Sequence, residues 1–189
     1  MKQEFQAPLG VHRIGNLTDP DHGIGGNTAP CSVSIEHVAH ILASTCCFAG
    51  RASAFYSVAQ HDYLASTIVP PEDALAALLL HAGDALKELV PLCLDAEGQT
   101  TADILADLGA PPCLPASVKY ADLILRTTAR SDLDPSQEDA WIRTTHASPL
   151  TQPIQPLAPI VAKHLFVDRY FELRPEADPR RPAIKEDET

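Results

Sequence analysis

Two histidines and an aspartate have the residue types and spacing to hold a metal ion. His61 lies in the stretch YSVAQHDYLAS, and His81 lies twenty residues further on in ALLLHAGDAL. Asp122 follows in VKYADLILRTTARSDL. All three occur where apolar residues repeat at helical spacing, and a buried imidazole or carboxylate there needs a partner. Imidazole and carboxylate are common ligands of divalent metals, so the set predicts a divalent-metal site.

The charge balance limits the partners of such a site. The chain of 189 residues has 14 basic and 25 acidic residues and a formal net charge of −11. This charge opposes binding to polymeric nucleic acid or to an anionic membrane surface. A small anionic ligand such as a nucleotide is still compatible, because a metal and a few local basic groups can reverse the potential inside a pocket.

The chain also lacks the signals of export or membrane insertion. No basic segment followed by an apolar stretch opens it, and no run of about 18 apolar residues occurs. The five cysteines include no CxxC spacing, which favours reduced thiols over a disulfide framework or a thiolate zinc site. We therefore expect a soluble, cytoplasmic protein.

The elements that position the candidate residues are predicted to be helices. Residues 1–33 are rich in Gly, Pro, Asn and Asp, which favours a long irregular loop or lid. Ser34 is a candidate N-cap for a helix that runs to about Cys46, and a second helix begins near Ser57. Pro71 can start a third, central helix through ALAALLLHAGDALKEL, which would carry both His81 and Asp84.

Further helical patterns complete one all-α domain over residues 34–174. They cover Ala116 to Arg130, Ser136 to His146 and Ala158 to Leu173, with at most one short helix in DAEGQTTADILADLG. The apolar face from Ile160 to Phe171 could serve the core or the interface of a homo-oligomer. Residues 175–189 mix Pro and charge and are predicted to be disordered.

Several of these segments resemble the HD-domain phosphohydrolases. The quoted matches are SIEHVAHILASTCCFAG, FYSVAQH, ALLLHAGDAL, VKYADLILRTTARSDL and FVDRYFEL. The chain is most similar to the phage dATP triphosphohydrolase and bacterial 5′-deoxynucleotidase members of that family. The resemblance covers roughly residues 11–173 and implies an all-α HD-domain helical bundle.

The resemblance implies a metal-dependent phosphohydrolase acting on a deoxynucleoside mono- or triphosphate. His61, His81 and Asp122 match three ligands of the family's divalent metal, which would be Mn, Co, Zn or Mg. Such an ion polarises a phosphate oxygen and lowers the pKa of a bound water. The family's Asp after the second histidine is Ala82 here, and the acidic residue that assists water is Ala85.

Two nearby carboxylates could compensate for the missing ligand. Asp84 lies three residues after His81 and would share its helix face, so we favour it as the residue that completes the site or orients water. Asp62 is a second possibility, although adjacent residues lie about 100° apart on an α-helix. Neither carboxylate need reach a metal.

Four further residues are candidates for substrate binding. Arg51 could replace an arginine that family members often have where this chain has Cys47. The others, Lys87, Lys119 and His40, have equally simple interpretations as surface charges or a core histidine.

The two alanines also support an alternative from a different class of protein. Replacement of both functional positions, Ala82 and Ala85, is the pattern expected if catalysis was lost. The chain would then be a catalytically inactive HD-domain pseudoenzyme that binds a nucleotide or a protein partner.

Overall fold

Helices form the regular structure of the protein. The computed structural model describes residues 33–89, 100–133 and 147–180. Over these ranges extended residues pair only in a single antiparallel bridge, between Cys46 and Ser57. The predicted all-α class is therefore confirmed. The elements are α1 (Ile35–Ser44), η1 (Cys47–Gly50), α2 (Val58–Ile68), η2 (Pro71–Asp73), α3 (Ala74–Leu78), α4 (Ala82–Leu89), α5 (Thr101–Asp107), α6 (Ala116–Leu133), α8 (Pro159–Leu173) and η5 (Pro175–Ala177), where η marks a 3-10 helix.

The predicted helix starts are confirmed at three positions. Ser34 is the N-cap of α1, in a capping box with His37. Ser57 is the N-cap of α2, and its Oγ accepts a hydrogen bond from the backbone N–H of Gln60. Pro71 opens η2, where its missing N–H costs nothing. Local capping chemistry thus sets where the helices around the site begin.

The prediction of a single helix after Pro71 is wrong, because the helix is interrupted at residues 79–81. Helix α3 ends at Leu78 and α4 begins at Ala82. In between, the N–H of Leu80 bonds the carbonyl of Ala77, a tighter turn than an α-helix makes. The backbone N–H of His81 instead donates to Asp62 Oδ2 at 3.2 Å. His81 therefore stands in the turn before α4.

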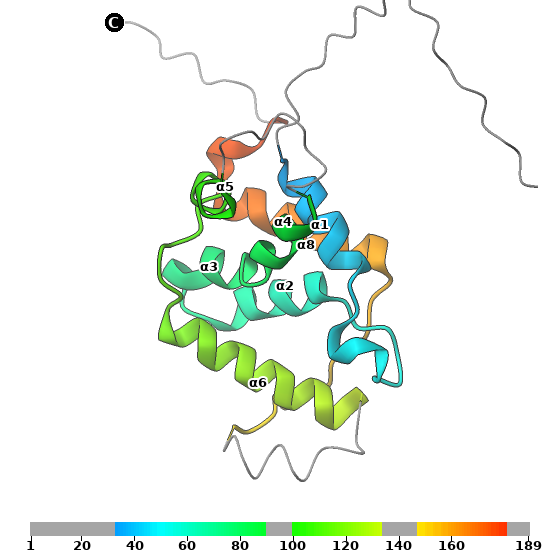
Figure 1. Ribbon diagram of the computed structural model, residues 1–189. Helices are drawn as coiled ribbons and strands as arrows, with labels where there is room; N and C mark the ends of the chain where they lie inside the picture. Colours follow the sequence, from blue (N-terminus) through cyan, green and yellow to red (C-terminus); the bar gives the residue numbers. More distant parts are fainter. Residues whose placement is uncertain (1–32, 90–99, 134–146, 181–189) are drawn as a thin grey trace, which may run out of the picture.

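Helix α2 lies at the centre of the fold and contacts α1, α3, α6 and α8 (Figure 1). Two apolar clusters flank it. One joins residues of α1, α4 and α8, including Val38, Leu86 and Phe166. The other joins α2, α3 and α6, including Leu125. Because α2 is packed from several directions, its polar residues His61 and Asp62 are buried and must be satisfied by the protein.

The C-terminal helix α8 contributes to the core with part of the predicted apolar face. Phe166 and Tyr170 are buried, whereas Ile160 and Val161 are exposed. The residues after it begin differently from the predicted disordered tail, because Pro175–Ala177 forms η5. Arg180 then lies over the Phe171 ring, with 5.1 Å from its guanidinium carbon to the ring centre.

Some predictions lie outside the described residues. They are most of the N-terminal loop, the helix Ser136 to His146 and the chain beyond residue 180. Within the ranges that are described, none of the helices has the length and apolar content needed to cross a membrane.

Candidate functional site

His61 on α2 and Asp122 on α6 form a direct hydrogen bond. The distance from His61 Nε2 to Asp122 Oδ1 is 2.9 Å. Because the carboxylate is the acceptor, Nε2 carries the hydrogen, and His61 Nδ1 then accepts from the Tyr56 hydroxyl at 3.3 Å. The side chain of His61 is only 4% exposed, and both of its ring nitrogens are hydrogen-bonded to protein groups.

The second histidine is held by a buried aspartate. His81 Nδ1 lies 2.6 Å from Asp62 Oδ1, and the side chain of Asp62 is fully buried. Asp62 thus fixes the His81 ring as well as the backbone turn described above. The rings of His61 and His81 meet edge to face, with their centres 5.7 Å apart. With Nδ1 bonded to Asp62, Nε2 is the His81 nitrogen left to meet a ligand.

Arg126 completes this group and was not among the predicted site residues. It follows Asp122 by one helical turn on α6, and its Nε donates to Asp122 Oδ1 at 2.7 Å. The available sequence signal was the i,i+4 spacing of an acid and a base on a predicted helix. Arg126 is 44% exposed, so its guanidinium can also meet a ligand.

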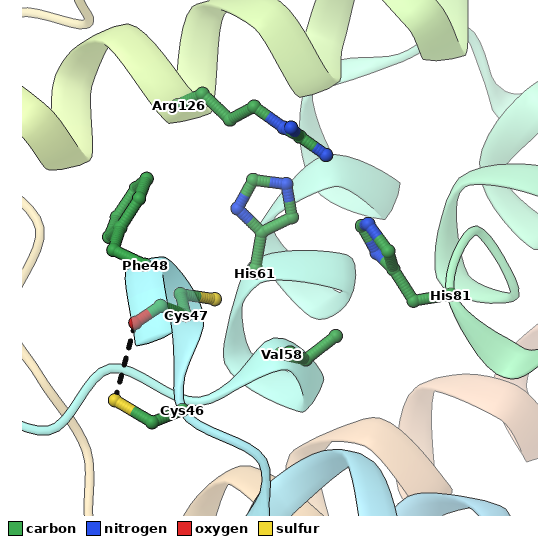
Figure 2. A pocket seen from close by; sticks show the side chains of 7 residues that line it. All are labelled: Cys46, Cys47, Phe48, Val58, His61, His81 and Arg126. Atoms are coloured by element: carbon green, nitrogen blue, oxygen red, sulfur yellow. Dashed lines mark hydrogen bonds between the residues drawn. The ribbon is translucent and has the colours of Figure 1, made fainter. Parts of the chain in front are cut away.

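The side chains of His61, His81 and Arg126 border one pocket of about 240 Å³. Figure 2 shows the His61 and His81 rings and the Arg126 side chain extending into the same space from three parts of the chain. The lining residues are Cys46, Cys47, Phe48, Val58, His61, His81 and Arg126. The pocket thus combines two imidazoles and a guanidinium with apolar walls.

The Asp62–His81 pair retains a proton at higher pH than an isolated histidine does. Burial raises the pKa of Asp62, against the opposing effect of the hydrogen bond from His81. Burial alone would lower the pKa of His81, but the hydrogen bond and charge of Asp62 outweigh it, and the pKa of His81 is raised. A protonated His81 directs its second N–H, on Nε2, away from Asp62.

Asp122 is held in its charged form. Burial opposes this charge, but the hydrogen bonds from His61 and Arg126 are stronger, and the pKa of Asp122 is lowered. The pKa of Tyr56 is raised by burial and then by nearby Cys47 and Asp62, so its hydroxyl stays protonated and donates to His61. Asp122 is therefore a fixed negative charge with Arg126 as its counter-ion.

The predicted metal ligands do not form a ligand cluster. Among the described residues, no group of three or more His, Cys, Asp or Glu side chains is arranged to hold a metal ion. The hydrogen bonds give a reason, since His61 Nε2 points its hydrogen at Asp122, and Asp122 also accepts from Arg126. We therefore derive no catalytic step from a metal ion.

The two candidate compensating carboxylates occupy different environments. Asp84, which we favoured, is 69% exposed and pairs with Lys87 at 2.8 Å on the surface of α4. It borders a neighbouring hollow, which also touches His81 and Val58. Asp62 is the carboxylate that reaches His81. Asp62 on α2 accepts both the ring and the backbone N–H of His81, whereas Asp84, in the first turn of α4, pairs with Lys87.

The predicted substrate-binding residues lie elsewhere on the surface. All four are exposed, and none lines the pocket: His40 on α1, Arg51 after η1, Lys87 on α4 and Lys119 on α6.

Cys47 provides a prediction about reactivity at the pocket wall. Burial and the charge of Asp62 raise its pKa to about 12. At pH 8 its thiolate fraction is then roughly 10⁻⁴, and the thiolate is the nucleophile. We expect iodoacetamide at pH 8 to modify exposed Cys113 and to leave Cys47 unmodified, as read by peptide mass spectrometry. Urea-unfolded protein should be modified at both, and equal native rates would contradict the raised pKa of Cys47.

The fold and the site together define an all-α protein with a pocket lined from η1, α2, α6 and the turn before α4, and His61, His81 and Arg126 are among its lining residues. No family model matches the chain. The uncharacterized protein YfdR of Escherichia coli (strain K12) is 38% identical over 151 residues, which cover 75% of this chain and 84% of YfdR. The chain belongs to the same family as YfdR.

Proposed function

We propose that this protein binds a nucleotide through its phosphate, in the pocket of His61, His81 and Arg126, without hydrolysing it. The observation that carries the proposal is the placement of Arg126. Its guanidinium is half exposed at the pocket while its Nε is anchored on Asp122. A guanidinium offers several N–H donors in a fixed plane, so one can bond Asp122 while others meet a phosphate.

His81 supplies a second donor for an anion. Asp62 holds its Nδ1 and raises its pKa, so the protonated ring presents Nε2–H to a ligand. Hydrogen bonds from a charged donor to phosphate are the stronger kind. The net negative charge of the chain repels polyanions such as a nucleic-acid backbone. The two cationic groups at the pocket, His81 and Arg126, are therefore better suited to a phosphate on a small molecule.

The size of the pocket agrees with partial enclosure of the ligand. Its volume of about 240 Å³ lies below the roughly 300–1,000 Å³ of typical ligand sites. The pocket can therefore hold a phosphate and part of its substituent, with the rest nearer solvent.

We infer that the pocket descends from an HD-domain phosphohydrolase site and that the helices form an HD-domain bundle. The resemblance of FYSVAQH and VKYAD supports this ancestry, and Ala82 and Ala85 support the loss of catalysis. Cys47 does not replace the missing groups as an activated thiolate, because its pKa is raised to about 12.

Metal-dependent hydrolysis of a deoxynucleotide is the second candidate function, and one observation favours it. Both pocket histidines have Nδ1 held by a buried partner, Tyr56 or Asp62. Metal-ligating histidines are usually oriented in this way by their second nitrogen. Mn²⁺, Co²⁺, Zn²⁺ or Mg²⁺ would then be the cofactor.

The pH dependence of binding distinguishes the two functions. The titratable and charged groups that face His81 are His61 and Asp62 on α2 and Asp122 and Arg126 on α6. An anion binds the protonated ring, so binding is complete below the raised pKa of His81 and is lost as pH rises through it. We expect the affinity for dAMP, measured by calorimetry in EDTA from pH 7 to 9, to fall by at most about tenfold per pH unit.

The chosen pH range removes the contribution of the ligand itself. The second pKa of a phosphate ester is about 6, so dAMP is doubly charged throughout the range. Metal binding needs a deprotonated imidazole and strengthens as pH rises. An affinity that increases from pH 7 to 9 and requires added Mn²⁺ would therefore support hydrolysis and contradict the binding proposal.

A further inference from the structure

We infer that Phe48 is a stacking platform for the base of the bound nucleotide, an inference that rests on the proposed function. Phe48 lines the same pocket as His61, His81 and Arg126. Figure 2 shows its ring standing beside His61 and below Arg126, on the side of the pocket opposite His81. A phosphate held between His81 and Arg126 therefore leaves the aromatic wall for another part of the ligand.

The backbone holds Phe48 in a conformation that non-glycine residues rarely adopt. Phe48 has φ 57° and ψ 25°, and Ala49 has φ 52° and ψ 37°. Among the described residues other than glycine, these two have positive φ. Such conformations persist only when neighbouring structure imposes them, and they are concentrated at functional sites.

The surrounding contacts supply that constraint. The N–H of Cys47 bonds the carbonyl of Tyr56 at 2.8 Å, and the N–H of Ser53 bonds the carbonyl of Leu133 at 2.7 Å. These bonds tie the short η1 segment to the start of α2 and to the end of α6. Arg130 of α6 adds a cation–π contact, with its guanidinium carbon 5.3 Å from the centre of the Phe48 ring.

This contact also orients the ring for a ligand. The Arg130 contact holds the ring in place before binding, and the ring lines the pocket, where a flat group can meet it. Stacking on an aromatic side chain is tolerant of base identity, since every base has a π face. The ligand class that fits both ends of the pocket is a phosphate carrying an aromatic base, rather than a sugar phosphate.

The test compares Phe48→Leu with the wild-type protein against two probes. Leucine keeps the wall apolar and removes the π face. We expect the Kd for dAMP to rise roughly 5- to 100-fold. The Kd for deoxyribose 5-phosphate, which has no base, should change less than twofold. Phe48→Trp should retain the affinity for dAMP, and Phe55→Leu, at an exposed phenylalanine outside the pocket, should leave both constants unchanged.

The outcomes separate this inference from the function on which it rests. If wild-type protein binds neither probe, the proposed function fails. If both probes bind and Phe48→Leu leaves the Kd for dAMP unchanged, only the stacking inference is overturned. An equal loss for both probes, in protein with wild-type circular dichroism, would also overturn it, because the effect would then not depend on the base.

Discussion

Replacing Asp62 by alanine is expected to destabilise the protein by about 2–4 kcal/mol, the largest effect of any single site change considered. Asp62 is fully buried and accepts hydrogen bonds from both the ring and the backbone N–H of His81. Alanine would leave a small cavity and two donors without their partner. The loss should appear as a lower midpoint in urea unfolding followed by circular dichroism.

Two variants control for this result. Asp62→Asn keeps an acceptor of similar size and should cost less than Asp62→Ala. Asp84→Ala removes a carboxylate that is 69% exposed and paired only on the surface, so stability should change by about 0.5 kcal/mol or less. Equal losses at positions 62 and 84 would contradict the assignment of Asp62 as the buried partner of His81.

Replacing Arg126 by glutamine is expected to raise the Kd for dAMP about 10- to 100-fold, because a hydrogen bond from a charged donor is lost. The fold should tolerate the change, since the ion pair with Asp122 is an i,i+4 pair on a half-exposed helix face. Calorimetry in EDTA measures the affinity, and unfolding in urea measures the stability. Arg126→Lys should recover only part of the affinity, because one ammonium cannot match the geometry of the guanidinium.

The exposed cations provide matched controls for the charge change. Arg51→Gln and Lys119→Gln each remove one positive charge outside the pocket, and each should change the Kd for dAMP less than twofold. A loss at Arg51 or Lys119 as large as that at Arg126 would show that long-range charge, rather than contact in the pocket, governs binding.

Much of the fold could be predicted from local signals. Ser34, Ser57 and Pro71 start helices for reasons that act within a few residues, and the apolar spacing up to Leu173 predicted α8. The break at residues 79–81 could not be predicted in this way. The run ALLL favours a continuous helix, and the interruption depends on Asp62, nineteen residues earlier, accepting the N–H of His81.

The candidate site, too, could be predicted from the sequence only in part. His61 and Asp122 were predicted from their types and are in contact, although they are 61 residues apart. Asp84 was favoured over Asp62 because it follows His81 on the same helix, but the carboxylate bonded to His81 is Asp62, which comes from the neighbouring helix α2. Arg126 was missed because an acid and a base four residues apart on a helix are most often a solvated surface pair. Only the packing of α6 against α2 brings that pair to the pocket.

The central claim is that Arg126 and His81 hold a nucleotide phosphate without a metal ion. Calorimetric titration of dAMP at pH 7 in EDTA, repeated with Mn²⁺ in place of EDTA, tests it most directly. We predict binding at one site in EDTA, an unchanged Kd with Mn²⁺, and no release of phosphate in either sample. No binding in EDTA, followed by binding or phosphate release on addition of Mn²⁺, would contradict the claim and identify a metal-dependent hydrolase.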